Sequence, residues 1–345
     1  MWMWIGYILL MLLIFGVMIF IHEFGHFITA RICGVAVKEF AIGMGPTLFS
    51  WRSKKHDTKY GLRLLPIGGF VSMVGEDEES DDSRAFCNKK IPQRMLIVIA
   101  GAIMNLILGF LLVMILVFSQ GPLASNVIAD FEENAVSQEK LQIGDEVVKV
   151  EHAYVHTGEE LVYEVMNKGY EPIDLTVIRN GEKIVLEDVC FGTFDESGAT
   201  FGSYDFKVKA ESRTFGNLIK HTFFRSISTV KMVYDSLIGL VTGRFGMEAV
   251  SGPVGVVEVV GDAAKMGWQN LIYIVAVLTI NLGVFNMLPF PALDGGRFLF
   301  LIIEAIRRKP INKNVESYIN FIGFIILFAF MIFVTFKDIL KLIFR

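Results

Sequence analysis

The chain has 345 residues, of which 53% are hydrophobic and 20% are charged, and its mean hydropathy is +0.52. This hydropathy excludes an ordinary soluble domain, and a net charge of −4 gives no reason to expect a nucleic-acid partner. The three cysteines, Cys33, Cys87 and Cys190, are too few and too scattered for a disulfide framework or a cysteine zinc site.

Four apolar stretches are long enough to cross a bilayer, which takes about 20 mostly apolar residues in a helix. They run from about Met1 to Ile28, from about Met95 to Phe118, onward from near Leu271, and from about Ile319 to Val334. The first stretch has neither the basic start nor the small-residue cleavage site of a signal peptide, so we interpret it as a retained span.

The first span ends in His22-Glu23-Phe24-Gly25-His26. Residues four apart share one face of a helix, so His22 and His26 reach a single metal ion while Glu23 stands beside it. Neutral imidazole is a good zinc ligand, and a carboxylate that is not a ligand accepts a proton from water at the metal. Polar groups in an apolar helix are costly, which favours a zinc site over the alternative, a polar cluster at the membrane interface.

The loop after the first span passes through Gly68 and Gly69 into Phe70 and Val71. The glycines permit a turn, and the apolar residues favour a strand. An exposed strand edge can pair with an extended peptide through backbone hydrogen bonds. We therefore expect this segment to hold an extended substrate beside the metal. The alternative is a hairpin that only caps the helical bundle.

The second span carries Gly101, Asn105 and Gly109 at intervals of four residues. Small residues with this spacing are typical of close helix packing. If it faces the site, the Asn105 side chain either contributes to packing or donates a hydrogen bond to substrate or to an oxyanion at the metal.

Lysine and arginine gather in the loop after the first span and in the loop before the fourth. The positive-inside rule places both loops in the cytoplasm. The N-terminus and the segment from about Ser119 to Gly267 then lie outside.

Between the second and third spans the composition is that of a soluble domain. The sequence predicts a short helix, a turn at Gly144-Asp145, a strand Val147–Val150, and a hairpin whose two strands are joined by Asn180-Gly181. This pattern resembles a PDZ domain, in which a helix and a strand form a groove for an extended peptide. Such a domain either binds a peptide or acts as a plug that only limits access.

The amphipathic stretch that follows, from about Thr214 to Val250, either lies along the outer membrane surface or packs in a bundle.

The third span is interrupted by Pro289 and Pro291, and Asp294 follows before apolar residues resume. A broken helix in a membrane is tolerated only inside protein or beside water. A catalytic zinc takes three protein ligands and leaves one position for water, and Asp294 is the strongest candidate for the third ligand. If the span ends at Pro289, Asp294 is instead a solvated loop residue.

These motifs together resemble the site-2 family of intramembrane metalloproteases, and specifically its bacterial sigma-regulating type with one PDZ insert. HExxH matches His22–His26, and NxxPxPxLDGG matches Asn286–Gly296. Four further segments follow in the family's order, although Ala102 replaces a family proline: Phe40–Pro46, Leu64–Glu76, Ala100–Asn105 and Ser251–Gly255.

The resemblance implies that His22, His26 and Asp294 bind zinc, that Glu23 is the general base, and that Asn286 holds the substrate backbone. It also implies a bacterial cell membrane as the location. The implied substrates are single-pass membrane proteins such as anti-sigma factors, or remnant signal peptides.

We therefore expect an α-helical integral membrane protein with about four transmembrane helices, a re-entrant cytoplasmic β-hairpin and an inserted extracytoplasmic PDZ domain of the α+β class. Its predicted parts are a first membrane core (1–118), the PDZ domain (119–210), amphipathic membrane-surface helices (211–267) and a second membrane core (268–345). Two other functions stay open. A catalytically silent PDZ scaffold would not need Glu23, and a metal transporter would need more polar residues along the spans.

Overall fold

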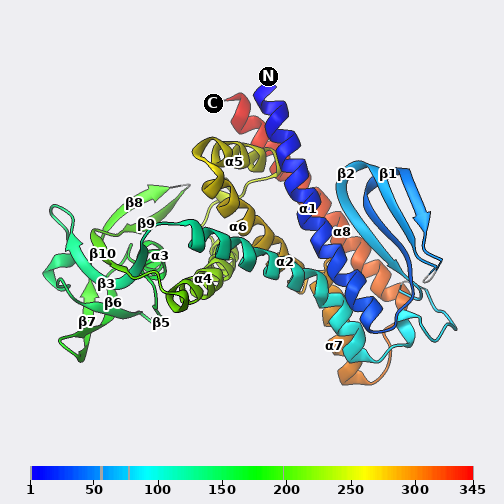
Figure 1. Ribbon diagram of the computed structural model, residues 1–345, viewed down its shortest axis with the longest axis horizontal. Coiled ribbons are helices and arrows are strands. Elements are labelled where there is room, and N and C mark those ends of the chain that lie inside the picture. Colours follow the sequence, from blue (N-terminus) through cyan, green and yellow to red (C-terminus); the bar gives the residue numbers. More distant parts are fainter. Residues whose placement is uncertain (1, 55–56, 77, 197, 345) are drawn as a thin grey trace. The chain divides into compact units, whose positions relative to one another are not determined.

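The computed structural model describes residues 2–54, 57–76, 78–196 and 198–344, and it divides into two compact units. Unit 1 comprises Met1–Gly109 and Ser251–Arg345, and unit 2 comprises Phe110–Val250. The helices are α1 (Trp2–Ile32), α2 (Ile91–Ser119), α3 (Gly158–Lys168), α4 (Phe215–Val241), α5 (Pro253–Met266), α6 (Trp268–Asn286), α7 (Asp294–Arg307) and α8 (Lys313–Ile343), as labelled in Figure 1. The strands are β1 (Val37–Arg52), β2 (Lys59–Met73), β3 (Leu123–Phe131), β4 (Glu146–Val150), β5 (Ala153–Tyr154), β6 (Ile173–Arg179), β7 (Glu182–Val189), β8 (Gly192–Glu196), β9 (Ala199–Ser203) and β10 (Phe206–Glu211). Short 3-10 helices cover Phe86–Asn88, Ser137–Glu139 and Met247–Ala249.

Four helices of the described chain are long and apolar enough to cross a membrane, namely α1, α2, α6 and α8. They coincide with the four predicted stretches, and α8 begins earlier than expected, at Lys313. The predicted interruption of the third span is also present, because α6 ends at Asn286 and a new helix, α7, begins at Asp294. The expected helical membrane protein with a sheet-rich insertion is therefore confirmed at this level.

The small sheet of unit 1 is made of two long, bent strands beside α1 (Figure 1). Residues 37–42 of β1 pair on one side with residues 59–62 of β2 and on the other side with residues 69–73 of the same strand. Residues 69–73 therefore form an outer edge, and no further strand of the described chain pairs with it.

The start of α5 in unit 1 is held by a carboxylate from the last helix. Asp338 of α8 is buried, and its Oδ2 accepts hydrogen bonds from the backbone N–H groups of Gly252 at 2.8 Å and Gly255 at 2.9 Å. Free N–H groups at a helix start need acceptors, and a carboxylate also suits the positive end of the helix dipole. The Ser251–Gly255 motif is thus explained by packing of α5 on α8.

Unit 2 contains an antiparallel sheet with the strand order β10-β3-β4-β6-β7, in which β5 pairs with β4. The predicted hairpin joins β6 and β7, and both of its turn residues have positive φ, 53° at Asn180 and 87° at Gly181. Asparagine and glycine tolerate this conformation best, which is why the two-residue turn forms here. The predicted helix before Gly144 is only the short 3-10 turn Ser137–Glu139.

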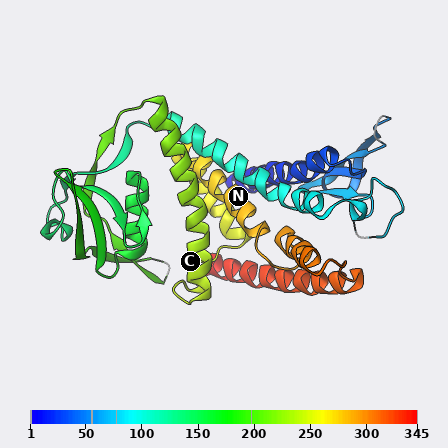
Figure 2. The ribbon, with the colours of Figure 1, turned by 90° about the horizontal axis from the view of Figure 1, so that it is seen from below.

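Helix α4 belongs to unit 2 and packs along α3, as Figures 1 and 2 both show. The phenol of Tyr163 donates to Asp235 at 2.7 Å, and the ring of His156 stacks on Phe224 with centroids 3.9 Å apart. The segment 211–267, which we expected to act as one group of membrane-surface helices, is thus divided, with α4 in unit 2 and α5 in unit 1.

His221 of α4 is buried between two carboxylates. Its Nε2 lies 2.8 Å from Glu211 at the end of β10, and its Nδ1 lies 3.6 Å from Glu159 of α3. Burial lowers the pKa of His221, but the bonds to Glu159 and Glu211 outweigh this effect and raise the pKa above its usual value. A single buried side chain therefore links α4 to both α3 and β10.

Candidate metal centre

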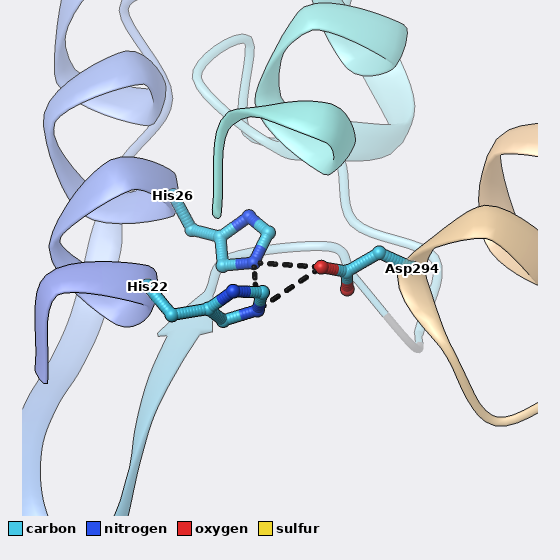
Figure 3. Close-up of side chains that lie close together, drawn as sticks. All are labelled: His22, His26 and Asp294. Carbon is cyan, nitrogen blue, oxygen red and sulfur yellow. Dashed lines mark hydrogen bonds and ion pairs between the residues drawn. The ribbon is translucent and has the colours of Figure 1, made fainter. Parts of the chain in front are cut away.

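Two histidines project from one face of α1, close to where that helix packs on α2. His22 and His26 are one turn apart, so their rings lie edge to face with centroids 4.9 Å apart (Figure 3). Gly25 stands between them in the sequence, directly against the carbonyl group of Ala100 in α2. The absence of a side chain at Gly25 lets the two helices approach closely enough for α2 to reach the rings.

Asp294 is the first residue of α7, and the break between α6 and α7 places it opposite the two histidines (Figure 3). The next two residues are glycines that pack against the preceding loop. A Cβ on Gly296 would lie 3.1 Å from Pro291 Cα and even closer to the carbonyl of Phe290, and a Cβ on Gly295 would meet the carbonyl groups of the same loop. The two glycines after Asp294 are thus needed for the first turn of α7 to pack against the loop that precedes it.

Three side-chain atoms converge between these helices. Asp294 Oδ2 lies 3.1 Å from His22 Nε2 and 3.2 Å from His26 Nε2, and the two nitrogens are 3.2 Å apart. Zinc bonds of about 2.0–2.1 Å in a tetrahedron place ligand atoms roughly 3.3 Å apart. The donor set, two imidazoles and one carboxylate, and its spacing therefore fit zinc.

Hydrogen bonds behind the histidine rings support the same orientation. His26 Nδ1 lies 2.8 Å from the carbonyl oxygen of Ile97, which only accepts, so Nδ1 carries the proton and Nε2 is free to bind a metal. His22 Nδ1 lies 3.2 Å from the side-chain amide of Asn105, which is completely buried. Asn105 Oδ1 has no hydrogen-bond partner among the described residues, and exchanging the amide oxygen and nitrogen lets Oδ1 accept the His22 Nδ1 proton.

Replacing Asn105 by alanine is expected to lower the affinity for zinc about 10–100-fold, because the partner that orients His22 is lost. Asn105→Asp keeps an acceptor and should retain the affinity. The measurement is competition with a chelator on the purified full chain. Asn286→Ala is the control, since its amide donates to Leu282 O at 3.1 Å. A zinc affinity unchanged in Asn105→Ala, with a raised KM, would instead favour the substrate-contacting role that the sequence left open.

Glu23 stands beside the three converging atoms without joining them. A cavity of about 190 Å³ is lined by Glu23, the three candidate ligands and the free edge of β2, which contributes Phe70, Val71 and Met73. The backbone N–H of Val71 faces the Glu23 carboxylate. A carboxylate that is oriented by the backbone next to a metal centre is suited to proton transfer.

The other residues predicted to contact substrate are Gly68, Gly69 and Asn286. Gly69 lies against Glu23, where an added Cβ would be 3.3 Å from Glu23 Cγ, and Gly68 has a positive φ of 81° at the turn that leads into the edge strand. Asn286 ends α6, and neither Asn286 nor Gly68 is among the described residues that line the cavity.

Several residues of the site were not singled out for it in the sequence. Ile97 and Gly101 lie on α2 against the histidine rings, and Glu76 and Arg297 line the cavity. A backbone acceptor such as Ile97 O leaves no sequence signal, whereas Arg297 directly follows the DGG motif and Glu76 is the last residue of the Leu64–Glu76 segment that resembles the family.

The HExxH helix, the aspartate of a broken span and the carboxylate beside them define a membrane metallopeptidase. The sequence profile of peptidase family M50 matches residues 10–330. The chain is 39% identical to a candidate zinc metalloprotease of Clostridium perfringens, over 97% of this chain and 98% of that relative. It is 32% identical to the zinc metalloprotease RasP of Bacillus licheniformis, over 96% and 98%, and 29% identical to the regulator of sigma-W protease RasP of Bacillus subtilis, over 99% and 100%.

The chain therefore belongs to peptidase family M50, the site-2 metalloproteases. It is a zinc-dependent intramembrane protease, as the sequence resemblance implied.

Proposed function

We propose that this protease cuts peptide bonds in or beside transmembrane segments with a zinc ion bound by His22, His26 and Asp294. The convergence of three ligand atoms within 3.2 Å of one another, beside Glu23, is the observation that carries the proposal. When bound there, zinc supplies a Lewis acid that lowers the pKa of water and polarises the scissile carbonyl.

Glu23 is the general base in this proposal. It accepts a proton from the attacking water and later donates this proton to the leaving amine nitrogen. The Val71 N–H fixes one side of its carboxylate, and the nearby Gly69 leaves room for the side chain. Residues of α1, α2, α7 and the sheet line the cavity, so they shield the reacting bond from water on several sides.

The free edge of β2 is the proposed holder of the extended substrate. Residues 69–73 pair with β1 on one side only, and Phe70 and Val71 line the same cavity as the candidate ligands. Backbone pairing with this edge would replace the hydrogen bonds that a substrate helix loses on unwinding. Asn286 and Asn105 remain further candidates for substrate contacts, although the burial of Asn105 behind His22 favours an orienting role for it.

The proposed substrates are single-pass membrane proteins, among them anti-sigma factors, and remnant signal peptides. The B. subtilis relative is named for its regulation of sigma-W, and the similarity covers nearly the whole of both chains. The proposed setting is the lipid bilayer of a bacterial cell, with the N-terminus and unit 2 outside and the metal centre toward the cytoplasm. The basic loops on either side of the spans support this orientation.

Unit 2 is proposed to contain an extracytoplasmic PDZ domain. Strand β10 is an edge at which an extended peptide could add. Helix α4 packs along α3 and bonds through His221 to Glu211 at the end of β10. These contacts favour a domain that limits access to the protease over one that binds a peptide.

The deciding experiment uses the purified, zinc-loaded full chain in lipid vesicles with a synthetic single-pass substrate. We expect one cut in or beside the substrate's transmembrane segment, lost after chelation and restored by zinc. His22→Ala should lose both zinc and cleavage, whereas the control His152→Ala, at an exposed turn of unit 2, should retain both. Cleavage that survives removal of the metal would contradict the proposal, and substrate binding without any cut would indicate a silent scaffold. Zinc uptake into sealed vesicles without any cut would indicate a transporter.

A further inference from the structure

The outward amides of the free edge of β2 face carboxylates of the protein itself, and one of them is hydrogen-bonded. Val74 N–H donates inward to Ala36 O at 2.9 Å, so the alternating amides of Val71 and Met73 point outward. Val71 N–H faces the Glu23 carboxylate, as described above, and Met73 N–H donates to Glu76 Oε2 at 3.2 Å. Side chains of the protein itself thus occupy the amides at which we propose that a substrate strand pairs.

Glu76 also ties this edge to the helix that carries the third candidate ligand. Its Oε1 lies 2.5 Å from Arg297 Nη1, so its two oxygens bond to different elements. Arg297 follows Asp294 by three residues and shares its side of α7. The Glu76 side chain is only 16% exposed, and both partners line the metal cavity.

We propose that Glu76 occupies the place of a substrate carbonyl on the Met73 amide, and that its pairing with Arg297 sets how easily a substrate displaces it. Glu76 is then a specificity-determining residue of the protease. The inference rests on the proposed role of the β2 edge as the holder of extended substrate.

The chemistry of the two acceptors explains the expected selectivity. A charged carboxylate makes a stronger hydrogen bond to an amide than a neutral peptide carbonyl does. A substrate therefore displaces Glu76 only when it gives up its own helical bonds at little cost. Segments with weak helical propensity meet this condition, and stable helices rich in alanine and leucine do not.

The test compares two synthetic single-pass substrates that share the same cleavage site. One carries glycine and serine residues next to the site, and the other carries alanine and leucine. In the full, zinc-loaded chain, Glu76→Ala should reduce the preference for the first substrate about tenfold, mainly by lowering KM for the stable helix. Glu79→Ala is the matched control, since Glu79 is an exposed acidic residue of the same loop, and it should keep the preference of the unmodified chain.

A second measurement does not depend on activity. Hydrogen exchange at the Met73 amide of the substrate-free chain should be faster in Glu76→Ala, with unchanged zinc content.

Glu76→Gln keeps an acceptor for Met73 but loses the charge that binds Arg297, so it should shift the substrate preference in the same direction as Glu76→Ala, by a smaller factor.

Two results would overturn the inference: an unchanged preference in an active Glu76→Ala enzyme, or a parallel loss of cleavage for both substrates at unchanged Met73 exchange. Failure of the unmodified chain to cut either substrate would instead count against the proposed function.

Discussion

Replacing Glu23 by glutamine is expected to lower kcat for peptide-bond hydrolysis by about 10²–10⁴-fold or more, the usual contribution of a general acid–base group. Glutamine has the same shape, and its carbonyl oxygen can still face the Val71 N–H as an acceptor. It does not accept a proton at neutral pH, so the attacking water keeps its proton. The measurement is single-turnover cleavage of a synthetic single-pass substrate by the purified chain.

The zinc content of Glu23→Gln should equal that of the unmodified chain, because the three converging ligand atoms belong to His22, His26 and Asp294 and none belongs to Glu23. This pair of readouts distinguishes a base from a ligand, since loss of a ligand lowers zinc content and cleavage together. Cleavage at the original rate in Glu23→Gln would remove Glu23 from its proposed role. Loss of zinc would place Glu23 among the ligands.

The sequence predicted the membrane-spanning helices well because apolar length alone determines them. The four stretches and the break between Asn286 and Asp294 are all present. The two-residue hairpin turn was equally predictable, since Asn180-Gly181 specifies a turn without help from tertiary contacts. The helix expected before Gly144 shortened to one 3-10 turn, because a few residues without a buried apolar face do not sustain an α-helix.

Amphipathicity identified α4 but did not say what its apolar face covers. A membrane surface and a protein surface require the same pattern of residues, and the structure shows contacts with α3 through Tyr163 and His156. Long-range placement of this kind depends on which partner surface is available, and that information is spread over distant parts of the chain.

The candidate ligands were predicted from spacing and motif, whereas their supports were not. The role of Glu76 was hidden, because Glu76 opens an acidic run that is most simply interpreted as a solvated loop. Its bonds to Met73 N–H and to Arg297, which lies 221 residues later, arise only when α7 folds against the sheet. Gly101 was interpreted as a helix-packing residue, and the structure shows that it also borders the histidine rings.

Gly101→Ala is expected to remove zinc from the centre by direct steric conflict. A Cβ at this position would lie 2.8 Å from His22 Nε2 and His22 Cε1, and even closer to His26 Nε2. Real Cβ atoms do not approach other atoms this closely, so both rings must turn. The neighbouring backbone offers little relief, because Gly25 already packs against Ala100 O.

The measurement is zinc affinity by chelator competition, together with the cooperative unfolding of the full chain. We expect the affinity to fall by more than about 100-fold, beyond the usual effect of a residue that only orients a ligand. Gly6→Ala in α1 is the matched control, since nothing lies within 4 Å of its added Cβ, and it should leave zinc binding unchanged. If Gly101→Ala binds zinc as tightly as the control, the metal does not depend on the positions that His22 and His26 hold in this structure. A folded chain that has lost zinc would instead show that one methyl group on α2 suffices to displace the ligands on α1, and that the packing of these two helices creates the site.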